Sequence, residues 1–284
     1  MFNKVLFPLD GSPESARILN YIGALPLAET VDVHLLGVTT GTEERSRLKT
    51  HLEQKARILG EDGYQVTCHL ANGDAADAIA NVAERHHVDA LCMFTHARHG
   101  FTRLLSGSVT ETVIRHIHCP VIGINETALG VLDQQPGGGV KNLLVPLDGD
   151  PREEEIVAMT RELGRDMNVI LFHDELGIGE QDNRGESAEL RKILLETKQN
   201  LARVGVGAEV ASSSLTHPAK AILEQAASTK NCTILMGSHG RSGMGLGLFG
   251  STAVEVLRAA TCPVIILRYD IPQSDKADDP FVNG

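Results

Sequence analysis

The sequence predicts a two-domain α/β protein, in which each domain is a doubly wound, five-stranded parallel sheet with helices on both faces. Two observations lead to this prediction. Three motifs recur in the same order after roughly 140 residues, and each half alternates short apolar runs with helix-like segments. Alternation of this kind favours a parallel sheet that is covered on both faces. The length of 284 residues fits two such domains.

The internal repeat covers nearly the whole chain. VLFPLDGSP from Val5 recurs as LLVPLDGDP from Leu143, FTHARHGFTRLLSGS from Phe94 recurs as GSHGRSGMGLGLFGS from Gly237, and HCPVIGI from His118 recurs as TCPVIIL from Thr261. We therefore place one domain at residues 1–126 and its copy at residues 141–271. Residues 127–140 contain a Gln-Gln-Pro-Gly-Gly-Gly run that predicts a flexible linker, and the polar residues 272–284 predict a frayed tail.

The alternation of elements is clearest in the second half. Strands are predicted at residues 141–147, 169–172, 208–211, 233–236 and 263–267. Helices are predicted at residues 151–167, 186–204, 217–227 and 250–260. Ile156, Met159 and Leu163 have the spacing of one helix face, and Pro218 suits the first turn of a helix.

The composition excludes several classes of function. With 37 acidic and 26 basic side chains, the formal charge of −11 argues against a protein that binds a nucleic-acid backbone, although local amides can still hold a small phosphate. The chain has no Trp, three Tyr and seven Phe, so it offers few platforms for stacking single-stranded bases. No apolar run is long enough for a membrane span, and the apolar start is too short for a signal peptide.

The cysteines indicate a reducing compartment. There are five of them, no CxxC motif occurs and the spacings are wide, so we do not expect a disulfide framework. We therefore expect a cytoplasmic protein. Cys119 and Cys262 precede proline in the two repeats and are predicted to be buried packing residues.

The residues that could carry chemistry follow the first and fourth predicted strands of each half. In a doubly wound sheet, ligands bind beyond the carboxyl ends of the strands. Asp148 follows the first strand of the second half and Gly237 follows the fourth, while Asp10 and Phe94 take the same positions in the first half. If those strands are neighbours, the two motifs line one crevice. Downstream of Asp148, residues 153–155 are all Glu and are predicted to be a solvated first turn of a helix.

The second-half loop that starts at Gly237 is rich in glycine and ends with Gly250, Ser251 and Thr252 at the start of a predicted helix. Free N–H groups and the helix dipole favour phosphate there. The alternative is a surface loop with an N-cap serine, and glycine density alone does not distinguish the two. Residues 245–250 spell GxGxxG, but a dinucleotide fold needs its first glycine directly after a strand. A P-loop needs lysine where Ser251 stands, so phosphoryl transfer of that kind is not expected.

These motifs together resemble the universal stress protein family in its tandem, two-domain form: PLDG after a first strand, GSHGRSG after a fourth, a Gly-Ser pair, then CPV before a fifth. The resemblance covers both halves and implies the strand order 3-2-1-4-5. It implies ATP as the ligand, with Mg²⁺ left open, through the motif G-x2-G-x9-G-[ST], which the second half matches completely. It also implies that residues 121–124 and 264–267 pair as a pseudo-dimer inside one chain, while association of two chains stays open.

The resemblance assigns roles to residues of the second half. Asp148 would meet the adenosine end, and Gly237 and Gly240 would meet the ribose and the α-phosphate. The outer phosphates would meet Gly250, Ser251 and Thr252. The backbone of Asp174 would face adenine, at a position where family members usually have Val. The full predicted site is Pro146, Leu147, Asp148, Asp174, Met236, Gly237, His239, Gly240, Arg241, Gly250, Ser251 and Thr252.

The first half departs from the nucleotide motif. Phe94 and Ala97 replace the first two glycines, and a phenylalanine ring at the strand end could fill the ribose space. The hypothesis is that the second half binds ATP and that the first half is a degenerate, weaker site. That weaker site comprises Asp10, Val38, Gly107 and Ser108.

Nine of the twelve histidines lie in the first half, with close pairs at His96/His99 and at His116/His118 beside Cys119. Imidazole and thiolate both bind zinc. However, His116 and His118 lie near a predicted helix C-terminus, where the dipole favours cationic side chains, and His96 recurs in the second half. We therefore do not expect zinc at either pair.

The preferred function is an ATP-binding stress-response or regulatory protein without a dedicated catalytic activity, in which ATP hydrolysis or self-phosphorylation is slow at most. Two alternatives stay open. One is a weak adenine-nucleotide hydrolase, for which the sequence offers no separate acid–base constellation. The other is an interaction or small-ligand-binding protein that has lost nucleotide dependence.

Overall fold

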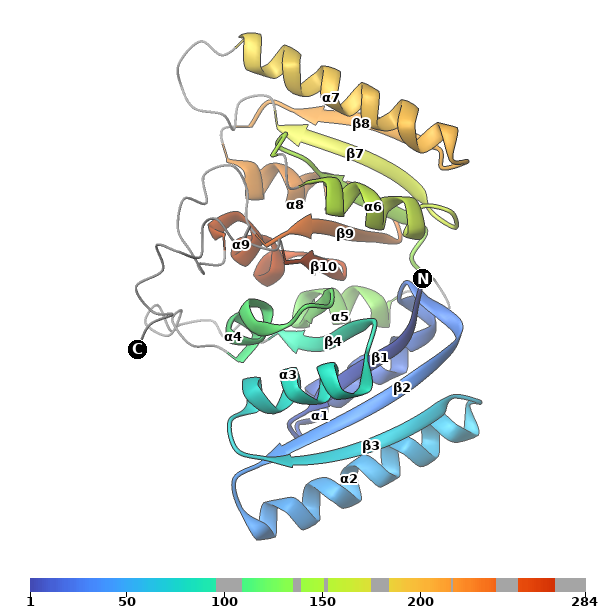
Figure 1. Ribbon diagram of the computed structural model, residues 1–284, viewed down its shortest axis with the longest axis vertical. Helices are drawn as coiled ribbons and strands as arrows, with labels where there is room; N and C mark the ends of the chain where they lie inside the picture. Colours follow the sequence, from blue (N-terminus) through green and yellow to red (C-terminus); the bar gives the residue numbers. More distant parts are fainter. Residues whose placement is uncertain are drawn as a thin grey trace.

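The structure is a computed structural model, and it describes residues 1–95, 109–134, 139–150, 153–174, 184–215, 217–238 and 250–268. Figure 1 shows a long twisted sheet with helices packed along it. Across these residues the sheet has the strand order β3-β2-β1-β4-β5-β10-β9-β6-β7-β8. Each half therefore has the order 3-2-1-4-5, which confirms the predicted fold class, and the two copies meet at their fifth strands.

The first half alternates strands and helices from its start. Its elements are β1 (Phe2–Leu9), α1 (Pro13–Arg17), the 3-10 helix η1 (Ile18–Ala24), β2 (Leu27–Thr39), α2 (Thr42–Glu61), β3 (Gln65–Asn72), α3 (Ala75–His86), β4 (Ala90–Thr95), α4 (Val109–His116) and β5 (Val121–Asn125), which is followed by α5 (Glu126–Asp133). The strands pair in parallel, and β1 lies between β2 and β4.

The second half repeats this pattern. Its elements are β6 (Asn142–Pro146), α6 (Glu154–Leu163), β7 (Asn168–Asp174), α7 (Arg184–Arg203), β8 (Ala208–Ser213), α8 (Pro218–Ser228), β9 (Cys232–Gly237), α9 (Ser251–Ala259) and β10 (Val264–Leu267). All the strands and helices predicted for this half are present. The helix predicted at 151–167 ends earlier than expected, at Leu163. At the next residue, Gly164, the chain passes so close to β7 that a Cβ atom would lie 2.7 Å from the side chain of Val169.

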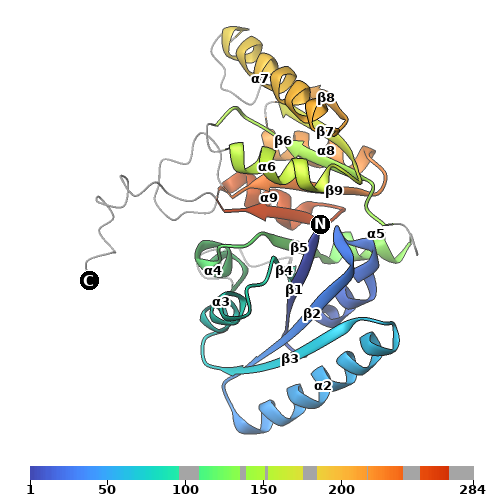
Figure 2. The same ribbon diagram turned by 45° about the vertical axis from the view of Figure 1, so that its right-hand side comes forward.

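Two apolar layers cover the sheet, one on each face. The helices η1, α2, α5, α6 and α7 contribute to one layer, and α3, α4, α8 and α9 contribute to the other. Figure 2 shows α3 and α4 on one side of the first half and α2 and α5 on the other. Successive strand residues point into opposite layers, so that Val5 and Phe7 lie in one and Leu6 in the other, all fully buried. This explains why the strands are apolar throughout. None of the described helices combines the length and the apolar character needed to span a membrane.

The two halves join through an antiparallel pairing of β5 with β10. Ile122 faces Ile265, Val121 faces Ile266 and Gly123 faces Val264. A Cβ atom on Gly123 would lie 2.3 Å from Cδ1 of Leu257 on α9, so glycine at this position lets the second half pack closely on the first. The pairing that the family resemblance implied therefore occurs within this single chain.

The predicted linker at residues 127–140 is wrong in its first part. Residues Glu126–Asp133 form the helix α5, whose Ala128, Leu129 and Leu132 are buried against the sheet. Arg17 reaches from α1 to both ends of α5, with its guanidinium 2.9 Å from Glu126 and 2.5 Å from Asp133. Burial of one apolar stripe stabilises the helix in spite of the nearby glycines. Residues 135–138 lie outside the described residues.

Asn125, the last residue of β5, connects α5 to the second half. Its Oδ1 accepts a hydrogen bond from the N–H of Ala128 and so caps α5. Its Nδ2 lies 3.0–3.1 Å from the carbonyl oxygens of Leu257, Arg258 and Ala260 at the end of α9. The side chain is only 1% exposed, so these bonds form away from water.

We expect Asn125→Ala to destabilise the protein by about 2–4 kcal/mol, because it leaves buried helix-end carbonyls and the α5 amide without this partner. Urea denaturation measures the change. Asn142→Ala is the matched control, because Asn142 donates to the carbonyl of Lys230 at an exposed position, and we expect a loss below about 1 kcal/mol there. Equal losses would contradict the role of Asn125.

Candidate functional site

The predicted site residues of the second half lie at the carboxyl ends of three neighbouring strands. β6 lies between β7 and β9 and is parallel to both. The strand ends therefore place Asp148, Asp174 and Gly237 at one edge of the sheet, together with Pro146, Leu147 and Met236. This is the edge at which doubly wound folds bind ligands. His239, Gly240 and Arg241 lie outside the described residues, as do Gly107 and Ser108.

The helix α9 begins beside this edge. Gly250 is its N-cap, and its first intrahelical bond runs from Val254 N to Gly250 O at 3.0 Å. The N–H groups of Ser251 and Thr252 precede that bond, so the helix itself does not use them. The N–H of Gly250, by contrast, donates to Ser238 O at 2.8 Å. The N–H groups that could bind a ligand at this helix start therefore begin at Ser251.

Glu153 is buried at the base of the same edge. Its side chain folds back so that the carboxylate accepts from the N–H groups of Asp148 and Gly149, at 2.6 and 3.0 Å. The residue is 8% exposed, so the prediction of a solvated turn at residues 153–155 is wrong for Glu153, whereas Glu154 and Glu155 are exposed in the first turn of α6. Burial and the neighbouring charge of Asp148 raise the pKa of the Glu153 carboxyl to about 8.

The corresponding loop of the first half carries serine hydroxyl groups in place of carboxyl groups. Ser15 takes the position of Glu153, and the Oδ1 atom of Asp10 accepts from Ser12 N, Ser12 Oγ and Ser15 Oγ at 2.6–2.9 Å. Phe94, which replaces Gly237, is buried in the apolar layer that also holds Phe7. Hydroxyl donors in the first half thus stand where the second half has a second carboxylate.

Asp174 ends β7 in the position that Val38 takes on β2. Its Oδ1 accepts from the N–H of Leu215, 3.0 Å away, in the segment after β8. Val38 instead packs partly buried against the apolar layer of α3. Asp174 therefore has a local structural role in holding the segment after β8 against the end of β7.

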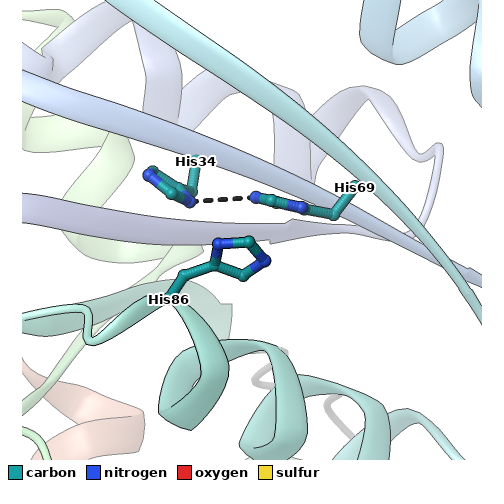
Figure 3. A group of neighbouring side chains, drawn as sticks. All are labelled: His34, His69 and His86. Carbon is teal, nitrogen blue, oxygen red and sulfur yellow. Dashed lines mark hydrogen bonds between the residues drawn. The ribbon is translucent and has the colours of Figure 1, made fainter.

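The described residues include a cluster of three histidines, but none of the three belongs to the pairs that the sequence singled out. His116 bonds through Nδ1 to the carbonyl of Thr112 in its own helix, and burial raises the pKa of the Cys119 thiol to about 12. His96 and His99 lie outside the described residues. A different group, His34, His69 and His86, comes together from β2, β3 and α3 (Figure 3). Sequence reasoning missed it, although His34 and His69 lie in predictable strands.

The comparisons with known proteins agree with this architecture. A family model for the universal stress protein family matches residues 1–124 and 139–268. The chain is 30% identical over 182 residues to a universal stress protein of Mycobacterium tuberculosis, covering 60% of this chain and 59% of that protein. It is 38% identical over 145 residues to the universal stress protein YxiE of Bacillus subtilis, covering 43% of this chain and 98% of YxiE.

A solved structure shows the same fold over nearly the full chain. A universal stress protein of Archaeoglobus fulgidus superposes with a TM-score of 0.71 at 21% identity, covering 94% of this chain and 96% of that chain. With a Synechocystis relative the match spans 41% of the relative, so the chain spans about half the length of some curated relatives. The fold and the strand-end edge define a duplicated, doubly wound α/β protein. The chain belongs to the universal stress protein family, in its tandem form.

The raised pKa of Glu153 predicts a pH dependence of stability. The folded-state pKa of about 8 exceeds the ordinary value of 4.5, so the folded protein holds this proton more tightly than the unfolded chain does. This contribution is fully present below pH 4.5 and is lost as the pH rises through 8. We expect Glu153→Gln to remove on the order of 2 kcal/mol of pH-dependent stability across that window.

Urea denaturation across the window measures this change. Glu154→Gln is the matched control, because Glu154 is the next residue along the chain, the first of α6, and is exposed. If Glu153→Gln has the same dependence of stability on pH as the wild type, Glu153 is not the group that causes this dependence.

Proposed function

We propose that this chain is an ATP-binding stress-response or regulatory protein and that its C-terminal domain holds most of the nucleotide. The observation that carries this proposal is the complete motif of the second half, at Gly237, Gly240, Gly250 and Ser251, whose described members lie at the carboxyl edge of the sheet and at the start of α9. Phosphate is favoured at such a helix start by free N–H groups and by the dipole.

The geometry refines the role of each part of this edge. The N–H groups of Ser251 and Thr252 would meet the outer phosphates, whereas the N–H of Gly250 is already bonded to Ser238. Gly237 and Gly240 would allow close approach of the ribose and the α-phosphate. Asp148 would meet the adenosine end, and the backbone of Asp174 would face the base. Mg²⁺ would offset the phosphate charge near Asp148.

The two halves would then differ in occupancy. The first half keeps Asp10, but three donors from Ser12 and Ser15 already converge on its Oδ1 atom. Phe94 stands where the second half has Gly237. We propose one main nucleotide site per chain, a weak or absent second site, and at most slow hydrolysis or self-phosphorylation.

One observation favours a second candidate function. Asp148, Glu153 and Asp174 place three carboxyl groups at the edge that ATP would have to approach, and the neutral form of buried Glu153 removes only part of that charge. A protein that has exchanged nucleotide for another small ligand or for a protein partner fits this charge. A homodimer is compatible with either function. The five free cysteines support a cytoplasmic setting.

Isothermal titration with Mg²⁺–ATP tests the main proposal. We expect about one nucleotide per chain for the wild type, in line with a single complete motif. Gly250→Val should abolish this binding, because the branched side chain would occupy the space in front of α9. Gly107→Val, at the corresponding position of the first half, should retain it. Two equal sites would overturn the asymmetry, and the absence of binding would favour the second candidate.

A further inference from the structure

Three histidines of the first half meet between the sheet and the C-terminal end of α3. Nδ1 of His34 on β2 lies 2.9 Å from Nε2 of His69 on β3, and the two rings stack with centroids 5.0 Å apart (Figure 3). The ring of His86, the last residue of α3, lies 4.3 Å from that of His69 and 5.4 Å from that of His34. One ring nitrogen from each residue lies within 4.8 Å of the others.

The orientation of His34 suits a metal ligand. Its second nitrogen, Nε2, lies 3.4 Å from Oδ2 of Asp32. A carboxylate at one ring nitrogen holds the proton there and leaves the lone pair of the other nitrogen free to coordinate, which is the usual arrangement around metal-bound histidines. For His34 that nitrogen is Nδ1, which is hydrogen-bonded to Nε2 of His69, so metal binding replaces this hydrogen bond and requires the His69 proton to lie on Nδ1 of its own ring.

The spacing of the nitrogens is close to that of a coordinated ion. Two nitrogens bound to tetrahedral zinc at roughly 2.0–2.1 Å lie about 3.3–3.4 Å apart. The His34–His69 separation of 2.9 Å needs a small expansion, and the half-buried ring of His86 can turn inwards to shorten its own separations.

The charges around the cluster partly offset one another. Lys4 donates from Nζ to the carbonyl of His86 at 3.2 Å, so one positive charge lies nearby. The negative charge of Asp32 favours the protonated form of both His34 and His69, whereas the positive charge of Lys4 disfavours it for His34. Burial also differs within the cluster, because His34 is 5% exposed while His69 and His86 are half-buried, which leaves a route for an ion and a water ligand.

The second half shows that the fold does not require these histidines. Leu6 on β1 pairs with His34, and its counterpart Leu144 pairs with Ile170. His69 pairs with Leu36, and the corresponding pair of the second half is Ala211 with Phe172. Ile170 and Ala211 therefore take the positions of His34 and His69, so the strands of this fold do not need histidine there.

We propose that His34, His69 and His86 bind one divalent transition-metal ion, with Zn²⁺ as the best match, and that a water molecule completes the tetrahedron. Three imidazoles and an open fourth position are a recognised zinc environment. The ion fastens the end of α3 to β2 and to β3, which is the edge strand of the first half. It lies by the end of α3 that leads into β4, away from the strand ends that form the candidate nucleotide site.

Titration of the untagged 284-residue chain with ZnCl₂ tests this proposal. We expect one zinc ion per chain for the wild type and at least about tenfold weaker binding for His69→Ala, since a two-histidine site is incomplete. The matched control is His217→Ala, which removes an exposed histidine from the second half and should bind zinc as the wild type does. Zinc should also raise the melting temperature of the wild type and of His217→Ala, but not that of His69→Ala.

Cobalt substitution supplies a readout of geometry. Co²⁺ at a three-histidine tetrahedral site gives visible absorption bands, which we expect for the wild type and not for His69→Ala. His86→Gln provides a second variant at the partly exposed end of a helix, should His69→Ala fail to fold. Zinc binding of equal strength in all variants, no zinc binding to the wild type, or the absence of cobalt bands in the wild type would each overturn the proposal.

Discussion

The antiparallel pairing of β5 with β10 is the constraint on which the rest of the structure depends. Both strands are buried along their whole length, so either half alone would expose an apolar edge with unpaired backbone groups. Because the partner strand belongs to the same chain, the pairing does not depend on protein concentration. It leaves β3 and β8 as the edge strands, and both of these carry exposed polar positions.

The sequence was sufficient for the architecture and for part of the site. The ordered repeat of motifs and the apolar runs determine which segments are strands, and the strand ends then bring Asp148 and Gly237 together. The helix α5 was not predicted, because the glycine run after Gln135 outweighed the apolar spacing of Ala128, Leu129 and Leu132. The spacing of Ala128, Leu129 and Leu132 is that of one helix face, and it is the signal in the sequence that indicates α5.

The remaining features depend on contacts that a linear pattern does not contain. Glu153 resembles its neighbours Glu154 and Glu155 in sequence, and only the fold of the loop directs its side chain inward to two backbone amides. His34, His69 and His86 come from three elements, and their approach depends on the register of β2 with β3 and on where α3 ends. Side-chain identity alone therefore cannot distinguish a solvated acid from a buried one, or a scattered histidine from a clustered one.

The short helix α9 runs from the candidate nucleotide edge of the second half to the first half. Its first turn, at Ser251, faces the candidate nucleotide edge, and its last carbonyls are held by Asn125 of the first half. A helix transmits displacement along its axis as a nearly rigid rod, so movement at one end must be matched at the other. A ligand that pulled on the start of α9 would therefore strain the junction between the halves. The candidate nucleotide edge is thus mechanically coupled to the first half through α9 and the side chain of Asn125.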